Sequence, residues 1–419
     1  MKIKSFLLLA VMTMTSASAV MAQQTSSPYS KFGYGLLRDN ATSAQRQMGG
    51  VGYAMRSGRQ INVMNPASYA AIDSLTFLFD MGTDVSMYWR KDVTGSDKDW
   101  GGGIDYITMQ FPVSKTIGVS IGLLPYSSVG YAFGSDIENG VASNQGAGGI
   151  NQLYIGAGIT PFKNFAVGFN VSYLFGNTYN DTYATLETGT SSTLFERVME
   201  IKDFHFQFGA QYTLNLSRKN DLTLGVSYAP GKTLLGKTYR LKYDTSQDNV
   251  PEPTKEDIVD LKGNFSIADS WGFGINYEWN KQFQAEVDYT YQNWSKAKFA
   301  AIEELAGARL DDRWRIGAGV SYIPNPYGGY FKRITYRAGG FYNRDYVMVK
   351  NNNKYNHVRD YGFSCGFGFP TVKSKNVINL GFEYHHRQST PNALLTEKYF
   401  NITLGINFNG LWFYQPKLR

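Results

Sequence analysis

The side chains that usually perform catalysis or bind metal ions are scarce in this sequence. Its 419 residues include 4 histidines and 1 cysteine, Cys365. His385 and His386 are neighbours, and neighbouring side chains on a β-strand point to opposite faces, so this pair cannot hold one metal ion together. No His and Glu residues have the spacing of a helical zinc site. We therefore expect a protein that is not an enzyme and has no catalytic residue, no metal and no cofactor.

The charged residues offer docking contacts instead of catalysis. Three arginines, Arg46, Arg56 and Arg59, lie in a Gly-rich region near the N-terminus. Further along the chain, the polar face of alternating segments carries four carboxylates and one arginine, which are Glu278, Glu286, Asp288, Glu383 and Arg315. Because unpaired charges inside a protein are costly, we expect the two groups to form ion pairs. The alternative is that each charge is solvated in a water-filled interior.

The first 22 residues have the features of an export signal. Lys2 and Lys4 precede an apolar stretch from Phe6 to Met14 that is too short to span a bilayer, and residues 20–22 offer small side chains to a signal peptidase. We expect a signal peptide over residues 1–22. The net charge of +7 comes without a clustered basic run, so no nucleic-acid partner is expected.

Apolar and polar residues alternate in many segments after residue 74. Between Phe400 and Phe408 every second residue is apolar, which indicates a strand with one apolar and one polar face. Polar faces of this kind contain much Gly, Asn, Ser and Gln, and aromatic residues gather at strand ends, which favours a membrane barrel over the alternative, a soluble sandwich. We predict an all-β fold, a 14-stranded antiparallel transmembrane β-barrel over residues 75–411, followed by a periplasmic C-terminal extension over residues 412–419. The predicted strands are 75–89, 101–112, 116–131, 148–160, 164–180, 198–215, 220–243, 262–279, 282–293, 313–323, 330–343, 359–370, 376–386 and 399–411.

Residues 23–74 do not alternate in this way. They contain Gly49, Gly50 and Gly52, and they end near the tripeptide Asn65-Pro66-Ala67. A barrel of fourteen strands encloses a lumen wider than its own side chains can fill. We therefore predict an N-terminal hatch, or plug, inside the lumen. The alternative is a disordered periplasmic arm.

On these residues the chain resembles the FadL-type outer-membrane transporters of long-chain fatty acids and other hydrophobic compounds. Gly49-Gly50-x-Gly52-x-Ala54, followed by Asn65-Pro66-Ala67, is similar to the hatch of that family. Residues 267–277 resemble its Pro-Asp-Ser strand, and residues 288–295 and 312–319 resemble the segments that follow. The resemblance implies a hatch inside a fourteen-stranded barrel and lateral release of the ligand through an opening at a kinked third strand.

The resemblance implies a monomeric barrel, surrounded by outer-membrane lipid, that takes up a hydrophobic small-molecule ligand such as a long-chain fatty acid. The ligand would pass under the hatch and leave sideways near Pro125, because proline cannot donate a ladder hydrogen bond and kinks the third strand. The alternative is that Pro125 simply ends a short strand. Apolar residues placed to contact the ligand are Phe32, Tyr34, Met48 and Met55.

Both ends of the mature chain depart from the family pattern. Residues 29–35 are not the usual start of a hatch, and residues 412–419 run past the last apolar strand position. A second hypothesis therefore stays open, a non-transporting barrel that serves as an accessory or scaffold subunit of an envelope protein complex. A surface adhesin is a third hypothesis, which has no positive signal beyond loop length.

Overall fold

The computed structural model describes residues 25–411 except 94, 138–139, 187–191, 245–252, 303–307, 352 and 373–374. The expected signal peptide, residues 1–22, and the expected C-terminal extension, residues 412–419, lie outside the described residues. None of the helices in the described ranges has the length and hydropathy needed to cross a membrane.

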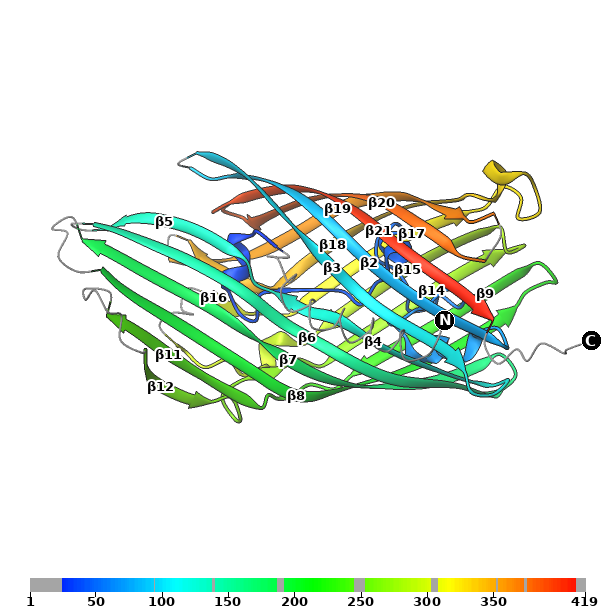
Figure 1. The fold of residues 1–419 in the computed structure, drawn as a ribbon, viewed down its shortest axis with the longest axis horizontal. Helices are drawn as coiled ribbons and strands as arrows, with labels where there is room; N and C mark the ends of the chain where they lie inside the picture. The colour runs from blue at the N-terminus through cyan, green and yellow to red at the C-terminus, as the bar shows by residue number, and fades with distance from the viewer. Residues whose placement is uncertain are drawn as a thin grey trace, which may run out of the picture.

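The fold is a closed antiparallel β-barrel whose wall contains fourteen strands, as the alternation predicts (Figure 1). Each strand pairs with its sequence neighbour in the wall, and the first and last strands pair along their whole lengths, which closes the ring. Closure of the ring is the condition for a sheet that spans lipid. The wall strands are β2 (Thr76–Lys91), β3 (Ser96–Pro112), β4 (Ile117–Ser128), β6 (Gly140–Phe162), β7 (Phe165–Leu186), β8 (Ser192–Asn215), β9 (Asn220–Ala229), β14 (Ser270–Trp279), β15 (Phe283–Gln292), β17 (Arg313–Tyr322), β18 (Thr335–Asn351), β19 (Lys354–Pro370), β20 (Val377–Thr390) and β21 (Thr396–Leu411).

The two faces of the wall follow the alternation of the sequence. In β21 the side chains of Leu404 and Phe408 are 42% and 45% exposed on the outside, whereas Thr403 and Asn407 are buried toward the lumen. Short turns connect the strands at the end where β21 finishes, on the right in Figure 1, and longer connections lie at the other end. We call these the short-turn end and the long-loop end.

At the long-loop end the prediction of one strand over residues 220–243 is wrong. The chain leaves the wall after Ala229, because Pro230 cannot donate to a ladder, and it returns as β11 (Gly236–Asp244) beside the far half of β8. A further strand, β12 (Thr254–Asp260), pairs with β11. The remaining short strands are β1 (Leu36–Leu37), β5 (Tyr131–Ile137), β10 (Lys232–Thr233), β13 (Ser266–Ile267) and β16 (Ala308–Leu310).

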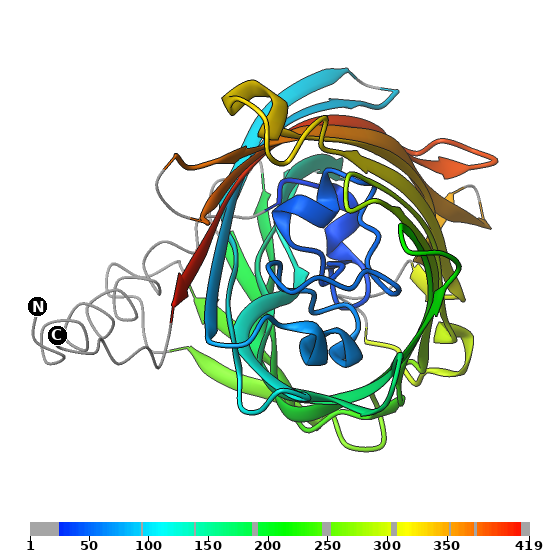
Figure 2. The same cartoon turned by 90° about the vertical axis from the view of Figure 1, so that its right-hand side faces the viewer.

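Residues 25–75, here called the hatch, occupy the lumen and appear in blue inside the ring of strands in Figure 2. The short helices of the hatch are η1 (Pro28–Lys31), α2 (Ser43–Arg46) and η2 (Pro66–Ala71). Its backbone lies directly against glycines of the wall. A Cβ atom on Gly168 of β7 would be 2.4 Å from the carbonyl carbon of Pro66, and one on Gly339 of β18 would be 2.2 Å from that of Met48. Glycine at these positions lets the hatch approach closer than any other residue would allow.

Candidate functional site

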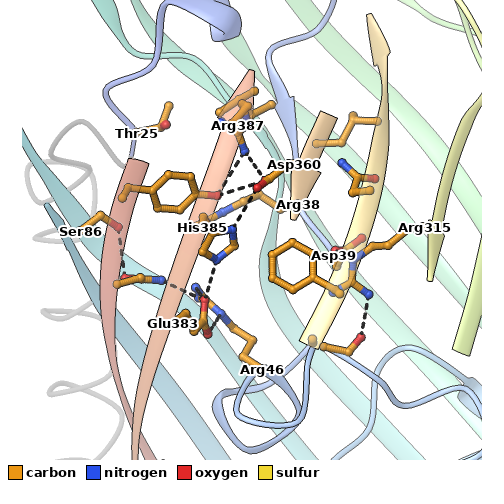
Figure 3. Close-up of a pocket in the computed structure, with 18 of the residues that line it drawn as sticks. Thr25, Arg38, Asp39, Arg46, Ser86, Arg315, Asp360, Glu383, His385 and Arg387 are labelled. Carbon is orange, nitrogen blue, oxygen red and sulfur yellow. Dashed lines mark hydrogen bonds and ion pairs between the residues drawn. The ribbon is translucent and has the colours of Figure 1, made fainter. Parts of the chain in front are cut away.

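Arg46 joins the hatch to two strands of the wall (Figure 3). It ends the helix α2, whose start is a capping box in which Gln45 accepts from the backbone N–H of Thr42. The guanidinium donates twice to Glu383 of β20, from Nε to Oε1 and from Nη2 to Oε2, both at 2.9 Å. It also donates to Asp105 of β3. Bidentate pairs of this kind are the stronger ion pairs in proteins.

A chain of polar contacts continues from Glu383 along the inside of the wall. The imidazole of His385 lies 3.4 Å from a Glu383 oxygen and 3.4 Å from an Asp360 oxygen. Arg387 lies 2.8 Å from Asp360 and 3.5 Å from Glu397. Along this row the carboxylates of Glu383, Asp360 and Glu397 each contact a guanidinium group, and His385 lies between two of them.

Asp39 makes a second ionic anchor for the hatch. Its carboxylate lies 2.9 Å from Arg313 and 3.2 Å from Arg315, both on β17. Burial alone would raise the pKa of Asp39, but the two guanidinium groups outweigh it and lower that pKa below its ordinary value. Arg315 also donates to the carbonyl oxygen of Gly49 at 2.6 Å. The anchor is therefore charged at neutral pH.

Glu286 and Asp288 hold the backbone of the hatch and not its arginines. Asp288 accepts from the N–H groups of Gly52 and Tyr53 at 2.6 and 3.0 Å, and Glu286 accepts from that of Ala54 at 2.8 Å. Both carboxylates come from β15, so one strand fixes three successive hatch amides.

The other residues of the expected ion pairs lie elsewhere. Arg56 donates to the hydroxyl of Thr160 at 3.2 Å, and Arg59 pairs within the hatch with Asp73 at 3.3 Å. Glu278 lines a cavity with Arg56, without a described hydrogen bond between them. Arg46 alone among the three arginines meets wall carboxylates. Glu383 is one of the carboxylates predicted to face inward, whereas Asp105 is not among them.

The Asn-Pro-Ala tripeptide is a structural cap. The side-chain oxygen of Asn65 accepts from the N–H of Ala67 at 3.1 Å, which caps η2. Its amide nitrogen donates to carbonyl oxygens of Tyr53 in the hatch and of Ala210 and Val226 in the wall, at 2.7 to 3.2 Å. Asn65 thus ties the end of the hatch to strands β8 and β9.

The four residues expected to contact an apolar ligand are not brought together. Tyr34 is fully buried in a cluster with Trp294 and Tyr346, and Phe32 packs against the same cluster. Met48 and Met55 form a separate buried cluster with Val51. None of the four lines a described lumen cavity.

Two lumen cavities beside the hatch are lined by charged and polar side chains together with apolar ones. The first has a volume of about 130 Å³ and is lined by five arginines and five carboxylates, Arg38, Arg46, Arg313, Arg315, Arg387, Asp39, Asp105, Asp345, Asp360 and Glu383. A second, of about 90 Å³, includes Gln152, His205 and Gln207 in its lining. Space of this size and polarity suits a few ordered water molecules.

The wall splits between its second and third strands, where the resemblance implies an opening. Strands β3 and β4 are paired over six positions only, Ile107–Pro112 with Gly118–Leu123. Beyond Leu123, β4 pairs on this side with β1 of the hatch. Pro125 lies at this change of partner, where the register of β4 with β6 also shifts.

The N-terminal strap, Thr25–Lys31, closes this split. Ser26 donates its hydroxyl to Asp99 of β3. On the same side of the split the hydroxyl of Ser27 donates to Glu397 of β21 at 2.8 Å. On the other side, after β4, the carbonyl oxygen of Gly130 accepts from the N–H of Ser27 at 2.7 Å. The strap therefore links strands that do not pair with each other here.

Three segments of the sequence have the spacing of catalytic or phosphate-binding motifs. Gly-x-Ser-x-Gly occurs at residues 118–122 and 362–366, and Gly-x-x-x-x-Gly-Lys-Thr occurs at residues 231–238. The first two lie inside β4 and β19, and the third ends in β11. A nucleophile elbow and a phosphate loop each lead into a helix. In strands the spacing carries no such chemistry.

The comparisons with known proteins identify the fold and a family. The model of the BamG family matches residues 2–419. No curated protein matches the chain. The structure is similar to the toluene transporter TodX of P. putida, with TM-score 0.60 and 16% identity over 90% of this chain and 100% of that one. It is similar to the toluene transporter TbuX of Ralstonia pickettii, with TM-score 0.58 and 14% identity over 88% and 98%. A Pseudomonas aeruginosa FadL homologue gives TM-score 0.60 and 12% identity over 89% and 99%.

Proposed function

The chain belongs to the BamG family, and from that premise we propose that it is a plugged outer-membrane barrel that serves as an accessory or scaffold subunit of an envelope protein complex. The observation that carries this proposal is the lumen, which is filled by a hatch held through buried ion pairs. The likeness to hydrocarbon transporters, at 12 to 16% identity, is a likeness of fold.

A passage for apolar molecules needs an apolar lining. Ligand sites of that kind are lined mainly by hydrophobic side chains, with few polar groups. Here ten charged side chains contribute to the lining of the cavity beside the hatch, so an acyl chain placed there would lie against ion pairs and not against a mainly hydrophobic wall.

Movement of the hatch would also break its anchors. Removing one partner from a buried ion pair costs about 3–5 kcal/mol, because the other charge is left uncompensated. Arg46 would leave both Glu383 and Asp105, and Asp39 would leave Arg313 and Arg315. These contacts support a hatch that stays in place.

The experiment is to extract the native protein from membranes in mild detergent, without heating, and to measure its mass and its bound molecules by native mass spectrometry. We expect a stoichiometric protein partner, and no saturable binding of palmitate or toluene to the purified chain. A barrel that runs alone and binds palmitate or toluene saturably would contradict the proposal.

A second candidate function is uptake of hydrophobic small molecules by hatch movement and lateral release, favoured by the split between β3 and β4 at Leu123. A disulfide between Ser26→Cys and Asp99→Cys, in a Cys365→Ser background, would lock the strap to β3. Under this second function, uptake of labelled palmitate by cells should stop in the oxidised protein and return on reduction. Under the scaffold function, oxidation should change neither uptake nor the partner.

A further inference from the structure

The connection between β17 and β18, residues 323–334, differs from the other connections at the short-turn end. The others are shorter, such as those at residues 163–164 and 280–282. This one contains the short helix η5 (Tyr330–Arg333). It lies at the right-hand end of the barrel in Figure 1 and at the outer margin of the ring in Figure 2, away from the hatch.

The turn presents aromatic side chains that the barrel does not cover. Tyr327 is 97% exposed and Phe331 is 77% exposed. The turn nevertheless has a defined shape, because the N–H of Asn325 donates to the carbonyl oxygen of Lys332 at 2.8 Å. Tyr330 and Phe331 also meet edge to face, with ring centroids 5.7 Å apart. An ordered turn that exposes large aromatic side chains indicates a surface that is covered in the working protein.

The charge of the turn indicates what covers it. Residues 323–334 contain Lys332 and Arg333 and no acidic residue. Tyr322 and Tyr336, at the adjoining strand ends, are 44% and 40% exposed on the outer wall, as in an aromatic girdle. Aromatic and basic side chains together at the edge of such a girdle fit the headgroup layer of an anionic membrane leaflet.

We propose that residues 323–334 form a lipid-binding turn. Tyr327 and Phe331 insert among the phospholipid headgroups of the periplasmic leaflet, and Lys332 and Arg333 contact anionic phosphate groups. The inference rests on the membrane placement in the proposed function and is independent of any partner protein.

The test measures the depth of a spin label on the turn. Gly329 has open space where a Cβ atom would stand, so Gly329→Cys in a Cys365→Ser background carries the label without a clash. The full mature chain is placed in vesicles of phosphatidylethanolamine, or in otherwise identical vesicles that also contain phosphatidylglycerol. The depth of the label is measured by the ratio of its accessibility to oxygen to its accessibility to a water-soluble nickel complex. A label at Lys219→Cys, in the turn between β8 and β9, is the matched control.

We expect the ratio of oxygen to nickel accessibility at residue 329 to rise several-fold when phosphatidylglycerol is present. The ratio for the control label should stay unchanged. Lys332→Gln with Arg333→Gln should abolish the dependence on phosphatidylglycerol. Tyr327→Ser with Phe331→Ser should reduce immersion in both vesicles. Heat-modifiable migration on gels confirms that each variant keeps its barrel, since the turn lies outside the wall.

Equal accessibility in the two vesicles would overturn the proposal. So would a label that becomes inaccessible to both reagents only when a periplasmic protein is added, because the turn would then be a protein interface. Neither result depends on whether the barrel co-purifies with a partner or binds palmitate, so failure here is distinct from failure of the proposed function.

Discussion

The centre of the hatch and its N-terminal strap are held in the lumen by different kinds of interaction. The centre, from Asp39 to Asn65, is fixed by ion pairs, by carboxylates that accept from backbone amides, and by close contact with wall glycines. The strap, Thr25–Lys31, is held mainly by serine hydrogen bonds at the split in the wall. Because single hydrogen bonds contribute about 1 kcal/mol and broken buried ion pairs cost more, the strap should detach before the centre does.

Arg46→Ala should have the largest effect on how firmly the centre is docked relative to the strap. The variant leaves Glu383 and Asp105 without their cation, and we expect docking of the centre to weaken by about 3–5 kcal/mol. Hydrogen exchange of the amides between residues 45 and 55 measures the change. Arg59→Ala is the control, since its pair with Asp73 is mostly exposed and worth at most about 1 kcal/mol. Equal exchange in the two variants would show that the ionic anchor does not fix the hatch.

Acid should release the centre through Asp39. Its pKa is lowered in the folded protein, so the docking that it supplies is complete above the ordinary pKa of 3.8 and is lost as the pH falls through the lowered value. We expect the contribution of Asp39 to the protection of the hatch to stay constant from pH 7 to about 4 and to be lost below that. Limited proteolysis with an acid-active protease measures this loss of protection. Asp39→Asn should remove the part of the acid transition that comes from Asp39. An acid transition that is identical in Asp39→Asn would assign the effect to another group.

The sequence predicts the wall of this barrel better than its interior, for a physical reason. Lipid on one side and the hatch on the other impose a period of two on every wall strand, and that period can be read locally, as in β21. Outside the lipid the constraint ends, which is why the sequence predicts β9 and β11 as one strand and does not predict β12. Partner choice inside the lumen depends on which strands face one another across it. Arg46 therefore meets Glu383 and not Glu286, although both carboxylates face inward.

A smaller effect is expected where shape and not charge holds the centre. Gly339→Ala would place a Cβ atom 2.2 Å from the carbonyl carbon of Met48, so the hatch must shift or strain. Overpacking of this kind costs about 1–3 kcal/mol. Exchange at Met48 and Gly49 should rise while the barrel keeps its heat-modifiable migration. Gly410→Ala, where a Cβ atom would have open space, should leave exchange unchanged. No difference between the two would mean that wall glycines do not set the fit.

The smallest effect is expected at the strap. Ser27→Ala removes the hydroxyl that donates to Glu397 at 2.8 Å but leaves the backbone bond from Ser27 to Gly130. We expect a loss of about 1–2 kcal/mol in docking of the strap, because the bond that is lost is to a carboxyl group. Exchange should rise at Ser30 and Gly130, which face each other across the split, and stay unchanged at Gly52 and Ala54. If exchange at Gly52 rises as well, the strap and the centre leave together, and the hatch is one cooperative unit instead of two.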